Sequence, residues 1–531
     1  MKLVTVPEIL AIEQAADAAG HTYAAMMERA GHGLAHQIHE NLGARKGKLL
    51  ALVGKGNNGG DTLIALTHLE QWGWDCTALL VDRPLEDDLA QRAGSAGCQL
   101  LSWGDVTPED LSTLVGGYSF LLDGLLGTGI RLPLRGPSQT VLALIKQQLP
   151  ALKEPPVIVA VDVPSGVDAV TGEAAPETLH ADLTVTMAAA KTGHFAFPAA
   201  TYTGRLALAD IGLPDDLHAW QAITREVVDN HWVRENLPPR PPDAHKGTFG
   251  SALVVAGSRN YVGAALLAGR AAARSGVGTL TLACPEGVYR LLAGHFPEAT
   301  WLPLPERDGA IAAEAAPLLL ENLGRTTGLL LGPGFGLADH TRLFIENFLA
   351  QTSSHEFPEV PMIFDADGLK LLSQLDDWPR RLPPQTILTP HPGEMAILTG
   401  LAVPEIQRNR LEVAEKYARI WGHVVVLKGA FTLVAAPDGR TALIPVATTA
   451  LAHGGTGDVL AGLAAGLRAQ GLGAFEAAVC AAWLHAEAGL AAERQLGSPA
   501  AVLAGDVLAG IPDVLRGLGE LDQRRDGIKP D

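Results

Sequence analysis

Cysteine is one of the scarcest residues in this 531-residue chain. The four cysteines stand far apart and form no C-x-x-C pair, which argues against a cysteine-rich zinc site and a disulfide scaffold. No uncharged apolar run reaches the roughly 18 residues that a membrane-spanning helix needs, and the first residues lack a signal-peptide core. We therefore expect reduced thiols in a cytoplasmic protein that does not bind membranes.

Positive charge is also in short supply, because 40 Lys and Arg face 58 Asp and Glu, for a net charge of −18. A chain this acidic is a poor general binder of polyanions, which excludes duplex nucleic acid as an expected partner. Hydrophobic residues nevertheless make up 47% of the chain, enough for large cores. A phosphorylated ligand would have to be held by local backbone amides.

Four prolines crowd the segment 236–247, which we interpret as an extended connector because proline clusters sustain neither a helix nor an inner strand. We place one domain at residues 1–215 and a second at 222–520. Both halves alternate continuous Val/Ile/Leu runs with helical periods. Such runs are typical of parallel strands covered on both faces, so the predicted fold class is α/β in both halves.

The segment Gly54–Thr62 is the first glycine-rich loop, and it lies between an expected strand and an expected helix. Its G-x-G-x-x-G pattern allows close approach of a pyrophosphate to a helix N-terminus, although the same glycines also suit a plain tight turn. Asn57, Asn58 and Asp61 crowd polar side chains into this turn. They could line a ligand or hold a monovalent cation, and Asp61 could instead cap the helix.

Three further loops follow expected strand ends, where ligands bind in open α/β sheets. Together they place Asp123, Asp162, Ser165 and Lys191 on one rim, beside Asn58. Oxygen donors from Asn58, Asp123 and Ser165 would suit a hard cation. Asp162 with Lys191 would suit general acid–base catalysis.

The strongest motif of the second half is Gly454-GTGDVLAG-Gly462. Its glycines can turn successive N–H groups into an anion hole at a helix start, where Asp458 could take a proton from an attacking hydroxyl. A glycine turn with Asp458 as helix cap is the alternative. No Walker A sequence occurs, so this is not a P-loop kinase.

Two more loops of the second half carry candidate ligands. His391 and Glu394 stand three residues apart after an expected strand, which indicates a ligand contact and a water-mediated route to Mg²⁺. Lys428–Thr432 could bracket a nucleotide phosphate or ribose, or could simply join two strands.

The motifs NNGGD, DGLLGTG, DVPSGVD and AxKTG, preceded by Glu13 and 26–31, occur in an order that resembles the epimerase domain of the NAD(P)H-hydrate repair enzymes. Thr62 departs from the glycine usual there. The motifs HKGxxG, GS-x(4)-GAA, GPGxG, TPHPGE and GTGD resemble the ADP-dependent dehydratase domain of the same enzymes. The first resemblance spans nearly all of 1–215 and the second roughly 222–520.

This resemblance implies a Rossmann-like three-layer domain followed by a ribokinase-like α/β domain. The first would interconvert the 6R and 6S hydrates of NADH and NADPH (NADHX and NADPHX). The second would dehydrate the 6S form at the expense of ADP, giving NAD(P)H, AMP and phosphate. The implied cofactors are K⁺ for the epimerase and Mg²⁺ for the dehydratase, with ADP as co-substrate; a homo-oligomer is expected.

The resemblance also assigns residues. The catalytic candidates are Asp162, Lys191 and Asp458, and the potassium ligands are Asn58, Asp123 and Ser165. The substrate contacts are Asn57, Asn58, Gly59, Gly60, Asp61, Gly127, Thr128, Gly129, Ile130, Arg131, Leu132, Pro133, Asp162, Ala264, Gly334, His391 and Asp458. The nucleotide contacts are Lys428, Gly429, Ala430, Phe431, Thr432 and Gly457.

Three other hypotheses stay open. A ribokinase-like small-molecule kinase fused to a nucleotide-binding module predicts a stable phosphorylated product and a preference for ATP. A dehydrogenase, suggested by the first glycine loop alone, leaves the second half unexplained. A catalytically silent N-terminal binding module receives slight support from Thr62.

Overall fold

The computed structural model describes residues 1–43, 47–352 and 359–525, with only the backbone of 520–525. Contacts divide the chain into two compact units, residues 1–225 and the part from Glu226 onward. The proline-rich segment expected to separate two domains therefore lies within the second unit.

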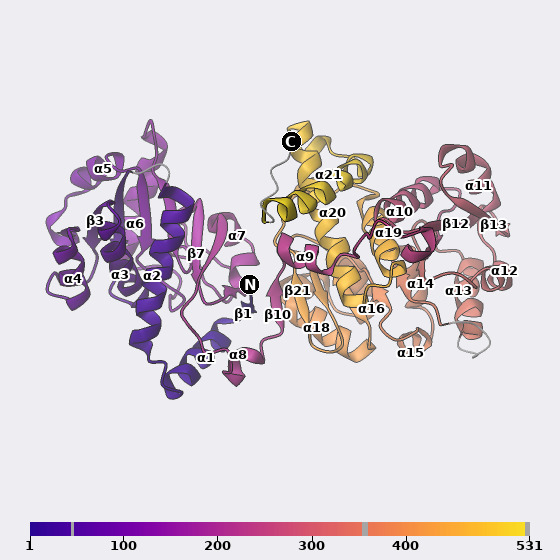
Figure 1. Ribbon diagram of the computed structural model, residues 1–531, viewed down its shortest axis with the longest axis horizontal. Coiled ribbons are helices and arrows are strands. Elements are labelled where there is room, and N and C mark those ends of the chain that lie inside the picture. Colours follow the sequence, from indigo (N-terminus) through magenta and orange to yellow (C-terminus); the bar gives the residue numbers. More distant parts are fainter. Residues whose placement is uncertain (44–46, 353–358, 526–531) are drawn as a thin grey trace. The chain divides into compact units, whose positions relative to one another are not determined.

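The first unit is built on a seven-stranded sheet in the order β4-β3-β2-β5-β6-β7-β9, and every neighbouring pair is parallel. Figure 1 shows this unit in indigo to magenta, with β3 and β7 labelled. Its strands are β2 Lys48–Val53, β3 Asp75–Leu80, β4 Gln99–Ser102, β5 Phe120–Gly124, β6 Val157–Val161, β7 Leu183–Met187 and β9 Arg205–Ala209. A short parallel pair, β1 Leu3–Val4 with β8 Ala190–Lys191, lies outside this sheet. The order reverses at β2, so the loops after β2 and β5 face a common crevice.

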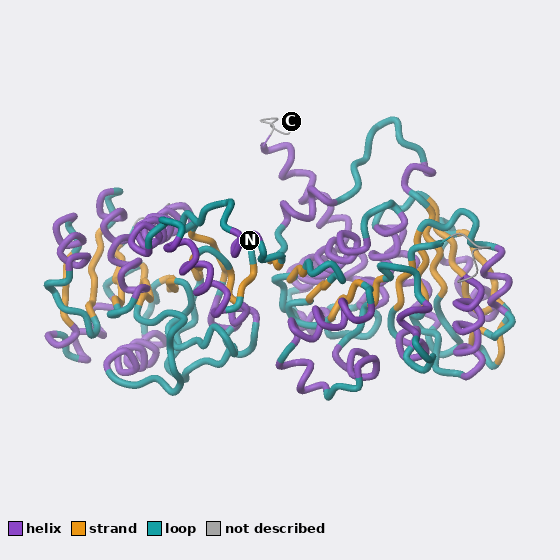
Figure 2. Tube along the Cα trace, turned by 90° about the horizontal axis from the view of Figure 1, so that it is seen from below, coloured by secondary structure: helices purple, strands orange, loops and turns teal. Residues whose placement is uncertain are grey.

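Helices cover both faces of this sheet and make three layers (Figure 2). Along β2, Leu49, Ala51 and Val53 join one buried cluster while Leu50 and Leu52 join the other, because side chains alternate across a strand. The first cluster packs against α1 to α4 and the second against α5 and α6. The helices are α1 Val6–Ala18, α2 Tyr23–Leu42, α3 Asn57–Gln71, α4 Asp88–Ala96, α5 Pro108–Gly116, α6 Pro137–Gln148, α7 Ala200–Thr203 and α8 His218–Gln221.

The second unit contains a ten-stranded sheet in the order β10-β21-β20-β19-β18-β17-β16-β11-β12-β13. The pairs from β19 to β13 are parallel, whereas β20 and β21 run antiparallel as a meander after β19. The strands are β10 Arg225–Val227, β11 Ser251–Val255, β12 Thr279–Pro285, β13 Thr300–Leu304, β16 Gly328–Leu331, β17 Met362–Phe364, β18 Ile387–Leu388, β19 Val424–Leu427, β20 Leu433–Ala435 and β21 Thr441–Leu443. A small hairpin pairs β14 Glu306–Arg307 with β15 Ala310–Ile311.

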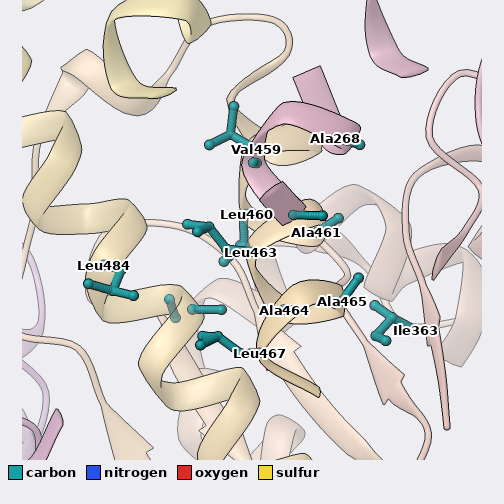
Figure 3. Close-up of a cluster of buried hydrophobic side chains, with 14 of the residues drawn as sticks. Ala268, Ile363, Val459, Leu460, Ala461, Leu463, Ala464, Ala465, Leu467 and Leu484 are labelled. Atoms are coloured by element: carbon teal, nitrogen blue, oxygen red, sulfur yellow. The ribbon is translucent and has the colours of Figure 1, made fainter. Parts of the chain in front are cut away.

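Helix α19 lies at the centre of the largest core (Figure 3). Its Val459, Leu463 and Leu467 are buried against the sheet and against α20. A Cβ on Gly462 would lie 2.1 Å from a carbonyl oxygen of α10, so glycine lets these two helices approach closely. The helices are α9 Asn230–Asn236, α10 Val262–Arg274, α11 Glu286–Leu292, α12 Ala315–Glu321, α13 Asp339–Thr352, α14 Asp367–Leu372, α15 Trp378–Arg381, α16 Pro392–Thr399, α17 Val403–Arg408, α18 Arg410–Trp421, α19 Thr456–Ala469, α20 Ala474–Leu496 and α21 Ala504–Arg525.

The predicted α/β class is confirmed in both units, and the central strands fall where the continuous apolar runs predicted them. The apolar runs did not predict the edge strands β4 and β13, because most residues of these strands are only half-buried. No helix among the described residues is long and apolar enough to cross a membrane.

Candidate active sites

The backbone is closely packed at the turn between β2 and α3. A Cβ on Gly54 would lie 1.9 Å from the carbonyl oxygen of Leu125, and one on Gly59 would lie 1.9 Å from that of Gly54. Only glycine fits at either position. The turn thereby brings Asn58, in the first turn of α3, beside the loop that follows β5.

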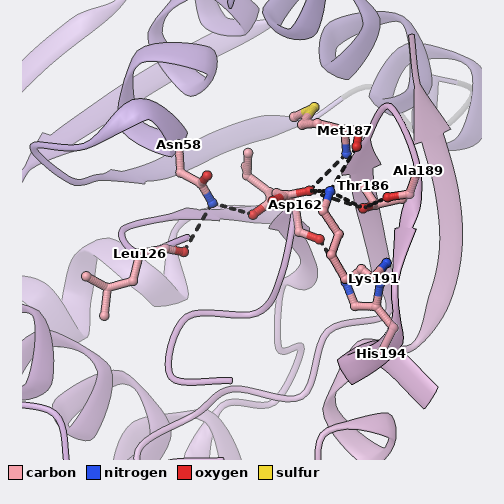
Figure 4. Close-up of polar contacts among 9 residues, drawn as sticks. Asn58, Leu126, Asp162, Thr186, Met187, Ala189, Lys191 and His194 are labelled. Carbon is pink, nitrogen blue, oxygen red and sulfur yellow. Dashed lines mark hydrogen bonds and ion pairs between the residues drawn. The ribbon is translucent and has the colours of Figure 1, made fainter. Parts of the chain in front are cut away.

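Asn58, Asp123 and Ser165, the predicted potassium ligands, meet at this crevice. The Ser165 hydroxyl donates to Asp123 Oδ1 at 2.6 Å, and the Ser165 N–H donates to Oδ2 at 2.9 Å. The Asn58 amide donates to the carbonyl oxygens of Leu126 and Val161 at 3.1 and 2.6 Å (Figure 4). Burial raises the pKa of Asp123, and no cationic side chain of the described residues pairs with it. The site is therefore rich in oxygen and lacks a counter-charge.

Asp162 and Lys191 form a buried ion pair (Figure 4). Asp162 follows the carboxyl end of β6, the same end of the sheet at which Asp123 lies in β5. Lys191 Nζ also donates to the Thr186 hydroxyl at 3.1 Å and to the Met187 carbonyl at 2.8 Å. Asp162 Oδ1 accepts the Met187 N–H at 3.0 Å. Burial opposes ionisation of Asp162, but the charge of Lys191 and these hydrogen bonds hold its pKa below the usual range. The backbone of Asp162 has φ 63°, a conformation that aspartate adopts at a cost.

His194 supports this ion pair, and we did not predict it from the sequence. Its Nδ1 accepts the N–H of Lys191 at 3.2 Å, so its Nε2 carries the proton and donates to the Asp162 carbonyl at 2.9 Å. Burial lowers the pKa of His194 to about 4 and keeps the ring neutral. The only available signal was its position three residues after the catalytic lysine candidate.

Asp61 and Glu13 add two more carboxyl groups around the same lysine. Asp61 is 7% exposed, and burial together with the charges of Asp162 and Glu13 raises its pKa well above the ordinary value. Burial also raises the pKa of Glu13. Three carboxyl groups thus share the single ammonium group of Lys191, which favours a bound proton in this cluster.

The other substrate candidates of this unit are mixed in exposure. A Cβ on Gly127 would lie 2.5 Å from Asn58 Oδ1, so this loop packs directly on the potassium candidate. Asn57 and Arg131 are exposed, whereas Gly59 and Gly60 are buried. Thr62 is fully buried, and its hydroxyl donates to the Asn58 carbonyl at 2.7 Å, so it lies inside the fold.

In the second unit, the glycine turn before α19 leads into the helix as predicted. Gly455 adopts φ +90°, and a Cβ there would lie 2.8 Å from the Leu267 side chain. Asp458 stands in the first turn of α19. Burial and the charges of Asp365 and Asp367 raise the pKa of Asp458 to about 7, while Lys428 opposes that rise.

Lys428 joins the carboxylates of this site. Its ammonium group lies 2.7 Å from Asp365 Oδ1 and 3.6 Å from Glu394 Oε2. The Thr389 hydroxyl donates to the same Asp365 oxygen at 2.6 Å. Burial alone would lower the pKa of Lys428, but the two carboxylates raise it, so the lysine stays charged.

His391 caps helix α16 and presents its ring to the site. Its Nδ1 accepts the backbone N–H groups of Gly393 and Glu394 at 3.0 and 3.3 Å, and the backbone N–H of His391 donates to Glu394 Oε2 at 2.9 Å. Burial lowers the pKa of His391, which favours a neutral ring.

A pocket of about 370 Å³ adjoins Lys428 and α19. Four of the five residues 428–432 line it, together with His391 and Gly457, but Phe431 does not. The remaining wall is largely apolar and was not predicted, because single apolar residues from several elements leave no sequence signal. It includes Ile444, Val446, Leu451, Leu460, Ala482 and His485.

Ala264 and Gly334, the two small substrate candidates, lie side by side. Ala264 is in the first turn of α10, and a Cβ on Gly334 would lie 2.8 Å from its Cβ. Gly334 also has φ +65°. A side chain at position 334 would therefore clash with Ala264 and Tyr261.

Two α/β units, each with polar loops at the carboxyl ends of parallel strands, define this chain as a two-domain enzyme of nucleotide chemistry. A family model described as NAD(P)H-hydrate dehydratase matches residues 252–512, and one described as YjeF-related protein N-terminus matches 23–193. The chain belongs to the family of bifunctional NAD(P)H-hydrate repair enzymes.

Relatives cover nearly the whole chain. The bifunctional NAD(P)H-hydrate repair enzyme Nnr of Moorella thermoacetica is 38% identical over 507 residues, 93% of each chain. That of Escherichia coli K12 is 33% identical, over 90% of this chain and 86% of the relative. Among solved structures, the ADP/ATP-dependent NAD(P)H-hydrate dehydratase from Bacillus subtilis, co-crystallised with ATP and Mg²⁺, is 36% identical, with TM-score 0.48. The match covers 56% of this chain and 100% of the Bacillus subtilis chain.

Proposed function

We propose that this chain repairs hydrated NADH and NADPH by two successive reactions. The first unit interconverts the 6R and 6S hydrates, and the second dehydrates the 6S hydrate at the expense of ADP. The observation that carries this proposal is the placement of Asp458, with a pKa near 7, at the start of α19 beside a nucleotide-sized pocket. Relatives named bifunctional NAD(P)H-hydrate repair enzymes match nearly the full length of the chain.

Epimerisation needs proton transfer, because carbon 6 of the hydrate bears both a hydroxyl and the ring nitrogen. Loss of the hydroxyl as water leaves an iminium, and water returns on the other face. In this proposal Asp162 and Lys191, held together by Thr186 and His194, move the protons. The loops 57–61 and 127–133 hold the hydrate.

The first unit fits a potassium ion. Asn58, Asp123 and Ser165 offer only hard oxygen donors beyond the Asn58 amide nitrogen, and Asp123 is a buried carboxyl with no cationic partner among the described residues. These three residues would hold K⁺, which would supply the missing counter-charge and orient the loop after β5. The ion's role is electrostatic, and the proton transfers belong to Asp162 and Lys191.

Dehydration needs a better leaving group than hydroxide. In this proposal the C6 hydroxyl of the hydrate attacks the β-phosphorus of ADP while Asp458 takes its proton, and the bond from phosphorus to AMP breaks. The nitrogen lone pair then expels phosphate from carbon 6, and loss of a proton from carbon 5 restores the double bond. The N–H groups at the glycine turn before α19 stabilise the charge on the transferring phosphoryl group.

The 370 Å³ pocket offers its apolar wall to the adenine base of ADP. Its polar side, made by Lys428, Gly429, Ala430, Thr432 and Gly457, would hold the phosphates. Among the described residues no group of three or more His, Cys, Asp or Glu is arranged to hold a metal. Mg²⁺ usually keeps several waters and binds through phosphates, so the buried Glu394 fits as its water-mediated partner. When bound, Mg²⁺ would neutralise phosphate charge.

The test is to mix the purified chain with hydrated NADH, Mg²⁺ and ADP and to follow the return of the reduced-nicotinamide absorbance. We expect both epimers to be recovered by the wild type. Asp458→Asn should block recovery yet still exchange the epimers, as read by NMR. Asp339→Asn, a change at a fully exposed carboxylate of the same unit, is the matched control and should behave as wild type.

Recovery of absorbance without any nucleotide, or none with either ADP or ATP, would contradict the dehydratase proposal. A stable phosphorylated product would favour the kinase alternative. That the chain forms a homo-oligomer stays a prediction, which sedimentation velocity would test. A cytoplasmic location stays a proposal, consistent with the four free, buried cysteines.

A further inference from the structure

Arg410 is a half-buried cation that has no acidic partner among the described residues. It opens helix α18, and no carboxylate of the described residues lies within ion-pair distance of it. Partial burial lowers its pKa to about 10. A charge held in such surroundings is costly unless an anion compensates it.

The guanidinium is fixed directly behind the loop that lines the nucleotide pocket. Its Nη2 donates to the Leu427 carbonyl at 3.0 Å, and its Nη1 donates to the Lys428 carbonyl at 3.3 Å and to Gln407 Oε1 at 3.2 Å. A Cβ on Gly429 would lie 3.0 Å from Nη1. Arg410 therefore contacts the back of the same peptide units whose front faces the pocket.

These contacts have two effects on an anion in the pocket. Arg410 binds the carbonyl oxygens of Leu427 and Lys428 on the side of the loop away from the pocket. Two partial negative charges are thereby kept away from the pocket. The positive charge itself lies behind Gly429, which lines the pocket and has φ +138°. Both effects favour negative charge on the front of the loop, in a region of low dielectric where charges interact strongly.

We propose that Arg410 is a positioning residue for the diphosphate of the nucleotide, whose charge supplies the anion that the protein itself does not provide. This inference rests on the proposed function, because it takes residues 428–432 as the phosphate-binding loop. Arg410 would act through the loop rather than touch the reacting atoms. Its contribution should grow with the number of phosphates on the ligand.

The test is calorimetric binding of ADP, AMP and adenosine to the full chain, with wild type, Arg410→Gln and Arg410→Lys. We expect Arg410→Gln to weaken ADP binding roughly tenfold to hundredfold, the range of a hydrogen-bonded charge, AMP less and adenosine hardly at all. Arg410→Lys keeps the charge and should recover part of the loss. Arg419→Gln, an exposed arginine on the same helix, should change nothing.

In steady state, Arg410→Gln should raise KM for ADP and leave kcat within about twofold, because the residue does not touch the reacting atoms. Equal loss for all three ligands would overturn the charge-based proposal, and unchanged ADP binding would overturn it altogether. If Arg410→Gln does not fold, Arg410→Lys is the test: we expect a smaller loss that still declines from ADP through AMP to adenosine, and an equal loss for all three ligands would overturn the proposal. A wild type that fails to bind ADP would instead refute the proposed function.

Discussion

Replacing Asp458 by asparagine should abolish dehydration and at the same time stabilise the second unit at alkaline pH. The carboxyl group is held at a pKa of about 7 by burial and by Asp365 and Asp367, against an ordinary value of 3.8. Between these two pH values the folded protein keeps a proton that the unfolded chain has released. The free energy of unfolding therefore falls as pH rises toward 7 and stays low above it.

The size of this effect follows from the shift. Over the roughly 1.5 pH units between 5.5 and this pKa, the folded carboxyl group holds a proton that the unfolded chain has released. Each unit lowers the free energy of unfolding by about 1.36 kcal/mol. Wild type should therefore lose roughly 2 kcal/mol across this interval through Asp458 alone. Asparagine does not titrate, so Asp458→Asn should gain about that much relative to wild type between the two pH values.

The assay is urea unfolding of both proteins at pH 5.5 and pH 8, read at the transition that ADP shifts, because that transition reports the second unit. Activity gives a second measurement. Ionised Asp458 is required as base, so the dehydratase rate of wild type should rise about tenfold from pH 6 toward a plateau above pH 7. The exposed Asp339→Asn change should show neither effect.

A stability difference between wild type and Asp458→Asn that is the same at both pH values would refute the raised pKa. A dehydratase rate already at its plateau at pH 5.5 would refute the role of Asp458 as the base, since most of the carboxyl group would then be protonated. Loss of activity without either pH effect would leave only a role in substrate contact.

Three further changes test other parts of the molecule. Lys191→Met should leave Asp162 buried and unpaired, slow epimer exchange by at least tenfold and cost about 3 kcal/mol, with dehydration of the 6S hydrate intact by absorbance. Gly462→Ala should lower the free energy of unfolding, measured in urea, by about 1–3 kcal/mol, because the new Cβ would clash with a carbonyl oxygen of α10. A Cβ at Gly505 would contact no other atom, so Gly505→Ala should leave the free energy of unfolding unchanged. Asn58→Ala should remove any rise in melting temperature that KCl gives over choline chloride; an undiminished rise would contradict the potassium assignment.

The sequence by itself determined the fold class and most central strands. Continuous apolar runs are buried on both faces in any parallel sheet, so their meaning does not depend on distant residues. The glycine turns at Gly54 and Gly455 were also readable, because a close backbone approach or a left-handed φ leaves glycine as the residue that fits. Residue order in the motifs was enough to name the candidate catalytic groups.

Only the tertiary structure decided how those groups are charged and what surrounds them. The pKa of Asp458 near 7 arises mainly from burial, which no local pattern encodes, and then from the charges of Asp365 and Asp367, about ninety residues away in the chain. The neutral tautomer of His194 and the unpaired charge of Arg410 likewise depend on which carbonyls the fold brings within reach. Protonation is set by desolvation and by charges close in space, and a linear sequence records neither.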